Sequence, residues 1–290
     1  TAVSTARGIP DGDGRVQALA ALVPFLSDDT RDEVLATAVS TARGIPDGDG
    51  RVQALAALVP FLSDDTRGEV LATAVESVRG ILDEHLRGQA LAALAPYLPA
   101  SLAGAALTGA RSIVDEYIRA TALVALAGHL DGDGLAEALA DIHSMRSGYA
   151  RGRGIAGVTR HLRSDQLIES LAAVRAIAEE EARAEAVHTI AEYLPLALLP
   201  RVLAMIPNSA AVATGLVLAR AQESGGPDSM GFLVALARQA WQHSSRRTCE
   251  VVVATMAPVV ASIGGQLAVE EGLAAVEESR RWWPGQRRDP

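Results

Sequence analysis

A direct repeat opens this chain: residues 1–36 and 37–72 carry the same 36-residue sequence and differ only at Asp32, which is Gly68 in the second copy. A unit of this length holds about two helices and cannot bury its apolar face alone. Stacking against neighbouring units must therefore supply the core. The repeat restricts the chain to a modular architecture in which each unit contacts the next one along the sequence.

The same unit continues in diverged form beyond residue 72. A basic residue opens a short apolar segment that ends in an aromatic residue or histidine and then leucine, as in RVQALAALVPFL from Arg51 and RGQALAALAPYL from Arg87. Further copies begin at Arg119, Arg151, Arg183 and, in weaker form, Arg247. Spacings of 36 and then 32 residues give about eight units in the chain of 290 residues.

Apolar residues within each unit fall at helical spacing. The first helix of a unit carries Ala90, Leu91, Leu94, Ala95 and Leu98, and the second carries Leu135, Leu139 and Ile142. Small residues are expected between neighbouring helices and allow close approach; they are Ala54, Ala57, Ala90 and Ala93. Short polar turns on both sides predict antiparallel helix pairs.

The predicted fold class is therefore all-α, a right-handed αα-solenoid of about eight helix-pair repeats of 32–36 residues. A low aromatic content of 3% suits thin, closely packed helices. The array is expected to cover residues 1–264. Residues 265–290 are expected to supply a C-terminal capping helix and a tail rich in Arg and Trp.

Charge and hydropathy exclude several classes of partner. A net charge of −9 argues against tracking a nucleic-acid backbone, which requires a continuous basic surface. No apolar run reaches the length of a membrane-spanning helix, and no signal peptide is visible. The single cysteine, Cys249, permits a reducing compartment, so a cytoplasmic location is predicted. Because Thr1 lies inside a repeat, the chain is expected to be a piece of a longer protein.

The run SLAGAALTGARSIVDEYIRATALVALAGHL, from Ser101 to Leu130, resembles the HEAT-like or tetratricopeptide-like arrays of many bacterial proteins. It is similar in particular to the C-terminal repeat regions of bacterial STAND-type signalling NTPases. The resemblance covers about residues 1–200 through a loose AL…LA…L/DE…RA pattern. It implies a helical array that serves as the ligand-sensing arm of a larger signalling ATPase.

Two glycine-rich motifs have both a functional and a structural interpretation. The DGDG sequences at Asp11, Asp47 and Asp131 resemble the start of a calcium loop, but the remaining ligands of such a loop are missing, and a polar helix-breaking turn is favoured. The GxGxxG sequence at 152–157 matches a dinucleotide-binding motif. It falls inside a predicted helix without a preceding strand, so close helix packing is favoured. No catalytic, cofactor-binding or metal-binding residues are predicted.

Two columns of side chains recur once per unit. One holds a ring at the end of the first helix: Phe25, Phe61, Tyr97, His129, His161 and Tyr193. It is interpreted either as an edge for peptide binding or, preferentially, as semi-buried filler between repeats. The other holds an arginine at the start of that helix, usually with an acid four residues earlier, which predicts a ladder of ion pairs. Because Ser147 replaces the acid, Arg151, with Arg153 nearby, is expected to be a free cation.

The predicted function is a non-catalytic scaffold that binds a protein or peptide. The candidate partner-binding residues are Tyr97, His129, His161, Tyr193, Arg151, Arg153, Trp282 and Trp283. The two tryptophans are expected either to insert into a partner or a membrane interface, or to fold back over the last helix. Two alternatives remain open, namely an enzyme on a HEAT-like scaffold and a purely structural spacer.

Overall fold

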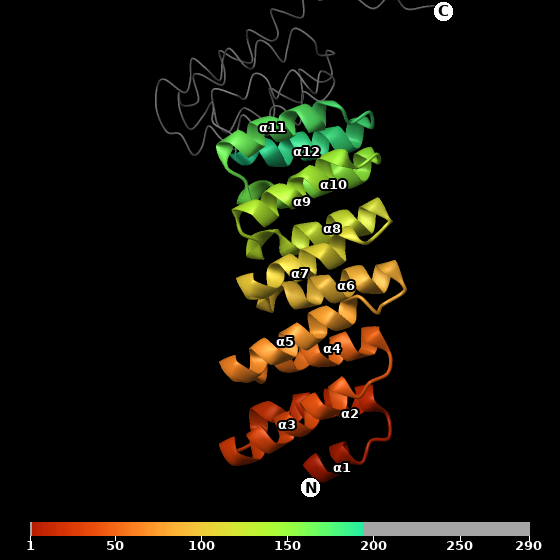
Figure 1. Ribbon diagram of the computed structural model, residues 1–290, viewed down its shortest axis with the longest axis vertical. Helices are drawn as coiled ribbons and strands as arrows, with labels where there is room; N and C mark the ends of the chain where they lie inside the picture. The colour runs from red at the N-terminus through yellow and green to blue at the C-terminus, as the bar shows by residue number, and fades with distance from the viewer. Residues whose placement is uncertain (1, 194–290) are drawn as a thin grey trace, which may run out of the picture. The chain divides into compact units, whose positions relative to one another are not determined.

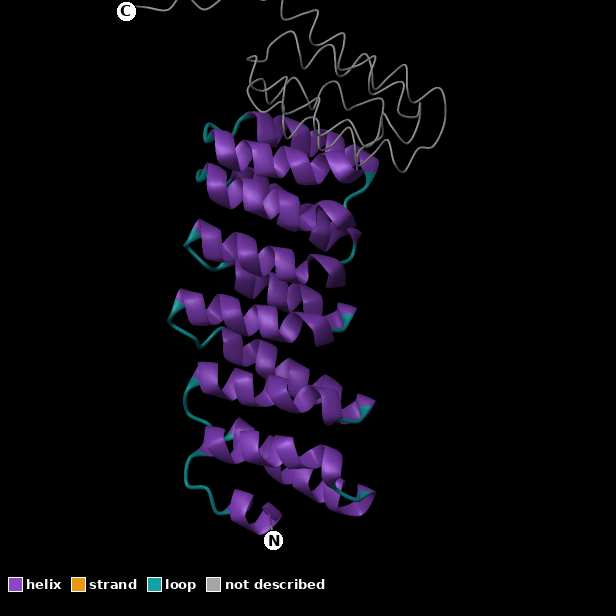
Figure 2. Ribbon diagram, turned by 180° about the vertical axis from the view of Figure 1, so that it is seen from behind, coloured by secondary structure: helices purple, strands orange, loops and turns teal. Residues whose placement is uncertain are grey.

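The computed structural model describes residues 2–193, and every regular element in that part of the chain is a helix (Figure 1, Figure 2). The all-α prediction is confirmed. The α-helices are α1 (Ala2–Arg7), α2 (Gly12–Leu22), α3 (Asp28–Arg43), α4 (Gly48–Leu58), α5 (Asp64–Val78), α6 (Glu84–Leu94), α7 (Ala100–Arg111), α8 (Glu116–Leu126), α9 (Gly132–Ser144), α10 (Gly148–Val158), α11 (Ser164–Arg175) and α12 (Glu180–Tyr193). The 3₁₀ helices are η1 (Val23–Phe25), η2 (Val59–Phe61), η3 (Ala95–Tyr97), η4 (Ala127–His129) and η5 (Thr159–His161).

The helices alternate between two types. The A helices, α2, α4, α6, α8, α10 and α12, contain the arginine that opens each repeat, and the B helices, α3, α5, α7, α9 and α11, follow them. Aspartates cap the first four A helices: Asp47, for example, accepts a hydrogen bond from Gly50 N at 2.9 Å. Proline then ends several of them. Pro60 and Pro96 lie in the 3₁₀ turns that close α4 and α6, where their missing N–H interrupts the α-helical ladder.

The two apolar stripes form the core. The A-helix residues Ala90, Leu91, Leu94, Ala95 and Leu98 are all at most 5% exposed, and the B-helix residues Leu135, Leu139 and Ile142 are buried as well. The small residues divide between two environments. Ala54 and Ala90 lie in the interior as expected, whereas Ala57 and Ala93 are exposed. The expectation that all four lie between helices is therefore wrong for the second pair.

The chain divides into two compact units, residues 1–162 and residues 163–290. In the first unit each A helix packs against the next, α2 on α4, α4 on α6, α6 on α8 and α8 on α10. B helices do the same from α5 to α7 and from α7 to α9. The A helices α2, α4 and α6 also contact the B helix that follows each of them, and α4, α6, α8 and α10 contact the B helix that precedes each of them (Figure 1). In the second unit α11 packs against α12.

No helix among residues 2–193 is long and apolar enough to cross a membrane. The predicted capping segment 265–290 and the repeat at Arg247 lie outside the described residues.

Candidate binding surface

Five arginines of the column, Arg15, Arg51, Arg87, Arg119 and Arg183, close the turn before their own A helix. Arg51 Nη1 donates to Ile45 O at 2.8 Å, and Arg119 Nη1 donates to Ile113 O at 2.8 Å. Arg15, Arg87 and Arg183 make the same bond to the carbonyl six residues earlier. These carbonyls lie just beyond the C-terminal end of a helix, where partial negative charge favours a cation.

The predicted ion pairs between these arginines and the acids four residues before them are wrong. Asp11, Asp47, Asp83 and Asp115 instead accept hydrogen bonds from backbone N–H groups in the first turn of their own A helix. The acids stabilise the positive end of one helix while the arginines stabilise the negative end of another. Both columns are structural parts of the same turn.

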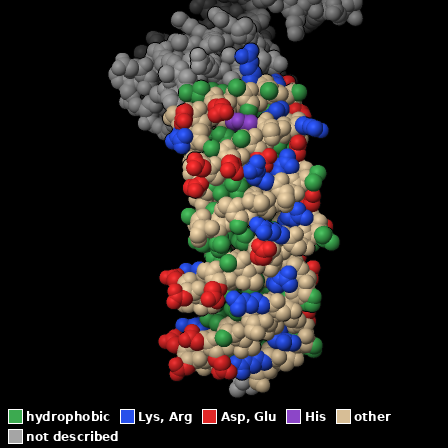
Figure 3. Space-filling view, in the orientation of Figure 1, with side chains coloured by type: hydrophobic (Ala, Val, Ile, Leu, Met, Phe, Trp, Pro, Cys, Tyr) green, Lys and Arg blue, Asp and Glu red, His purple; other side chains and the backbone are tan. Residues whose placement is uncertain are grey.

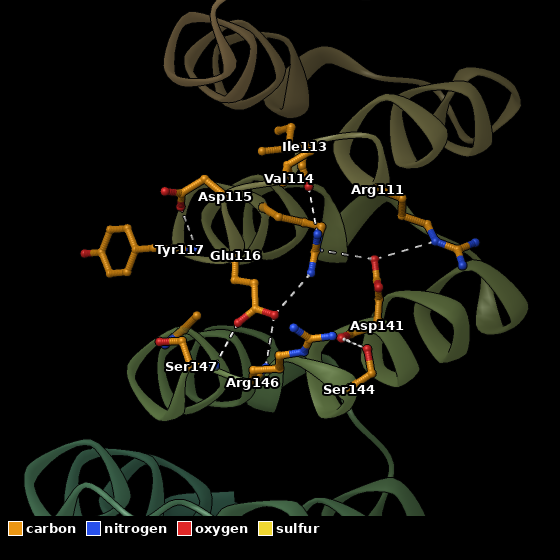
Figure 4. Close-up of polar contacts among 12 residues, drawn as sticks. Arg111, Ile113, Val114, Asp115, Glu116, Tyr117, Asp141, Ser144, Arg146 and Ser147 are labelled. Carbon is orange, nitrogen blue, oxygen red and sulfur yellow. Dashed lines mark hydrogen bonds and ion pairs between the residues drawn. The ribbon is translucent and has the colours of Figure 1, made fainter.

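The first residues of α6 and α8, Glu84 and Glu116, each connect their own repeat to the next one. Glu116 accepts hydrogen bonds from Arg146 N at 3.0 Å and Ser147 N at 2.7 Å, both in the turn before α10 (Figure 4). Glu84 makes the same pair of bonds to Val114 N and Asp115 N, each at 2.9 Å. These backbone hydrogen bonds are the main cause that lowers the pKa of both glutamates below the ordinary value of 4.5.

The lowered pKa makes a pH-dependent contribution to stability at Glu116. Because the folded-state pKa lies below the unfolded one, stabilisation is complete above about pH 4.5 and is lost as the pH falls through the folded-state value. We expect Glu116→Gln to lower the urea midpoint at pH 6 and to show a smaller deficit at pH 3.5, where part of the carboxylate is protonated. Glu137→Gln, which removes an exposed ion pair, is the control and should differ little at either pH. An equal deficit for Glu116→Gln at both pH values would contradict this assignment.

The B helices present a charged surface. Ion pairs run between the end of one B-type helix and the next, Arg7 to Glu33 at 2.9 Å and Arg111 to Glu137 at 2.8 Å. Exposed acids also gather where α3 and α5 begin, at Asp28 and Asp64 and their neighbours (Figure 3). Exposed pairs of this kind contribute little to stability, about 0–1 kcal/mol each.

The ring column occupies mixed environments. Tyr97 is 39% exposed and Tyr193 is 46% exposed, and Phe25 at 83% is more exposed than either. His129 and His161 are half-buried. The ring of His161 lies over Gly128 of the preceding repeat, where a Cβ would come within 3.0 Å of it, so this residue is the predicted filler between repeats.

The charge state of His161 is set by its surroundings. Arg160 Nε donates a hydrogen bond to His161 Nε2 at 3.0 Å. Burial lowers the pKa of His161, and the positive charges of Arg160 and His129 lower it further. The lowered pKa favours the uncharged imidazole at neutral pH, in agreement with the role of Nε2 as a hydrogen-bond acceptor.

The two candidate arginines differ. Arg151 is half-buried and has a polar partner, so its interpretation as a free cation is wrong. Arg153 is exposed, and its guanidinium lies over the ring of Tyr117 from the preceding A helix, 5.1 Å from the ring centroid. Its Nε also lies 3.3 Å from Thr121 Oγ1. These contacts hold the guanidinium in one orientation while the side chain stays exposed to solvent.

Two exposed tyrosines were missed by the sequence reasoning. Tyr117 is 52% exposed and Tyr149 is 50% exposed, and both occupy the second position of an A helix, 32 residues apart. Two features of the sequence could have identified them. Both tyrosines hold the same position in their repeats, and Tyr149 lies four residues before Arg153, on the same helix face. We call Tyr117, Tyr149 and Arg153 the tyrosine–arginine surface.

The glycine motifs have structural roles. Asp11, Asp47 and Asp131, which open the DGDG sequences, cap α2, α4 and α9. Within residues 2–193 no group of three or more His, Cys, Asp or Glu side chains is arranged to hold a metal ion. The GxGxxG sequence lies inside α10, where Gly154 faces Ile142 and Gly157 faces Val124. Both glycines provide room for neighbouring helices.

Comparisons with known proteins give no family assignment: no family model matches the chain, and no curated protein matches it significantly in sequence. Of the candidate partner-binding residues, Trp282 and Trp283 lie outside the described residues. The other six candidates lie among the described residues.

Proposed function

We propose that this chain is a non-catalytic scaffold that binds a protein or peptide through its A helices, and that it is built as a right-handed αα-solenoid of about eight repeats. The order of helix contacts in the first unit, in which each A helix from α2 to α8 packs on the next A helix, supports the repeat architecture. The resemblance to STAND-type signalling NTPases favours a role as the sensor arm of a larger cytoplasmic protein.

The observation that supports binding is the tyrosine–arginine surface. Tyrosine and arginine are enriched among the residues that dominate the energetics of protein interfaces. A tyrosine ring buries a large area with little loss of conformational freedom, and a guanidinium offers five hydrogen-bond donors in a planar arrangement. Here Tyr117 and Tyr149 are each about half exposed, and Arg153 is already oriented by one of the two rings. The B helices differ, since their outer residues pair with one another in ion pairs.

Site-specific photo-cross-linking tests this function. A photoreactive amino acid placed at Tyr117 or Tyr149 should give the same covalent adduct in cells of the source organism, and one placed at exposed Ala72 of α5 or Ala136 of α9 should not. The adduct is identified by mass spectrometry and its affinity is then measured with purified components.

We expect Tyr117→Ala combined with Tyr149→Ala to weaken that affinity at least about tenfold, equivalent to about 1.4 kcal/mol. Thr108→Ala, an exposed change on α7, is the matched control and should have no effect. If no position gives a defined adduct, or all four give the same one, the structural-spacer alternative is favoured. If the adduct is a small metabolite that is chemically converted, the enzyme alternative is favoured.

A further inference from the structure

A groove lies between the first two full-length B helices, α3 and α5. Its volume is about 550 Å³, which is within the range of ligand-binding pockets in proteins. The side chains at its floor are apolar: Leu35, Val39 and Leu62 are each at most 6% exposed, and Phe61 is half-buried. The groove therefore offers an apolar surface to a ligand that enters it.

The groove stays open because α5 contributes a polar wall. α5 packs on α7 and α7 packs on α9, whereas α3 and α5 do not pack closely in this way. Thr66 and Glu69 of α5 line the groove, and the residues at the same positions of the next B helix are Leu102 and Ala105. A carboxylate stays in water, whereas leucine and alanine are readily buried between helices. The contact between α3 and α5 is thus left incomplete.

Acidic side chains surround the apolar floor. Asp32 of α3 and Glu69 of α5 line the groove on opposite sides. Asp29 and Asp65 precede them by one helical turn and lie on the same faces of the two helices. All four residues are exposed, so their carboxylates form a negatively charged rim that a ligand can reach.

Negative charge predominates at this rim. Residues 28–33 of α3 and 64–69 of α5 together hold seven acidic residues and two arginines. Each of these arginines pairs with the aspartate three residues before it, at 2.8 Å in α3 and 2.7 Å in α5. Two further acids lie near arginines of other turns, at 2.9 and 3.8 Å. Within residues 2–193, Asp29, Asp32 and Asp65 take part in no ion pair.

We propose that this groove binds a peptide segment in which arginine or lysine side chains alternate with apolar ones. The apolar side chains lie on the groove floor, and the basic side chains meet the three aspartates that have no counter-charge. The site is separate from the tyrosine–arginine surface, so it adds a second binding surface to the proposed function. Charge complementarity selects the partner, because a basic segment is attracted to the rim and an acidic one is repelled. Arginine is the preferred cation, since its guanidinium binds a carboxylate through two parallel hydrogen bonds.

A second copy of this chain is a poorer occupant of the groove. Its net charge of −9 has the same sign as the rim, and like charges across an interface oppose association. The same repulsion acts on a nucleic-acid backbone. A basic segment of another protein meets neither obstacle.

Fluorescence anisotropy with the full chain tests the proposal. The probe is a labelled peptide of about eight residues in which Arg and Leu alternate. One comparison peptide has Gln in place of Arg, and the other has Ser in place of Leu. We expect each comparison peptide to bind at least about tenfold more weakly, because the first lacks the charge and the second lacks the apolar side chains.

A substitution inside the groove locates the site. Ala36 is exposed and lines the groove, so Ala36→Leu should occupy part of it and weaken binding of the Arg–Leu peptide at least about tenfold. Ala72→Leu is the matched control, because Ala72 is the exposed residue at the same position of the second sequence copy and does not line the groove. It should leave the affinity within about twofold of the unsubstituted chain.

Neutralisation of the rim tests the charge. The variant D29N/D32N/D65N should lose at least about tenfold in affinity for the Arg–Leu peptide. The variant D133N/E137Q/E169Q removes three exposed acids of α9 and α11 and should stay within about twofold. Circular dichroism verifies that all the variants remain helical.

Several results would overturn the proposal. Equal binding of the Arg–Leu and Arg–Ser peptides would show that an acidic surface alone attracts the probe. No binding of the Arg–Leu peptide, or equal losses in a groove variant and its control, would also contradict it. A dimer of the chain that Ala36→Leu dissociates would make a second copy the occupant. The cross-linking at Tyr117 and Tyr149 does not involve the groove, so a defined adduct there would leave the proposed function standing.

Discussion

Gly157→Val is expected to destabilise the fold by about 3 kcal/mol, at the upper end of the range for overpacking. A Cβ on Gly157 would lie 2.4 Å from Val124 Cγ2 and 2.5 Å from Val124 Cγ1, well inside van der Waals contact. Because the branches of Val124 are short and begin at its Cβ, they have no distant end to swing aside. The helices α8 and α10 must then move apart, and a decrease in the urea midpoint measures the cost.

The control for this prediction is Gly104→Ala in α7. No atom lies within 4 Å of a Cβ built on Gly104, and alanine is the better helix former, so a gain of about 0.5–1 kcal/mol is expected. Val124→Ala should restore part of the stability lost in Gly157→Val, because it removes the atoms that clash. A double variant no more stable than Gly157→Val alone would show that the loss has another origin.

Arg119→Met is expected to cost about 2–3 kcal/mol. The change keeps the apolar stem but removes the hydrogen bond to Ile113 O, and it leaves that carbonyl without its partner. It also withdraws the positive charge 3.9 Å from Asp141 Oδ2, an atom that is buried and accepts no hydrogen bond. The ion pair with Arg111, at 3.6 Å, then remains to that carboxylate.

Arg79→Met is the matched change at the surface. Arg79 is 53% exposed and makes one ion pair, with Glu76 three residues earlier, so the expected loss is at most about 0.5 kcal/mol. Urea midpoints of both variants at pH 7 provide the comparison. Equal losses for Arg119→Met and Arg79→Met would show that the bond to the isoleucine carbonyl contributes nothing beyond an exposed charge.

Helical periodicity predicted the elements well because burial imposes it directly. Leu91, Leu94, Leu135 and Ile142 were assigned to the core from spacing alone, and all are buried. The DGDG sequences were predicted as polar helix-breaking turns, and this was right only in part. Their first Asp caps the helix that follows, but the next three residues form the first turn of that helix. Both features depend on residues that are close together in the sequence, so the sequence alone is enough to predict them.

The partners of the arginines could not be predicted in the same way. The acceptor of Arg51 is a main-chain carbonyl, and every residue has one, so no side-chain pattern marks it. Ion pairs were predicted instead because most of these arginines have an acidic residue four positions before them. Ala57 was misplaced for a related reason: small size indicates permitted close approach but not the face of the helix on which it occurs.

Only part of the tyrosine–arginine surface was predicted from the sequence. Arg153 was named because it lies near Arg151, the arginine of the repeat whose acid is replaced by Ser147. Tyr117 and Tyr149 lie at a position where other repeats have Asp13, Asp49 or His85. Tyrosine therefore does not recur at this position from repeat to repeat. Only the packing of α10 on α8 brings Arg153 over Tyr117.

The turn closed by Asp47 and Arg51 has a consequence for how such a chain changes length. Both side chains bond to groups within six residues of themselves, and Arg51 Nε also donates to Ser77 Oγ at 2.9 Å in the following repeat. These bonds thus reach no further along the chain than the adjacent repeat. Residues 36 and 72 are both Ala, and each is followed by Thr, so excision of one 36-residue copy would recreate the sequence already present at the joint. Whole units can thus be gained or lost by recombination in frame, with every turn intact and only the reach of the array altered.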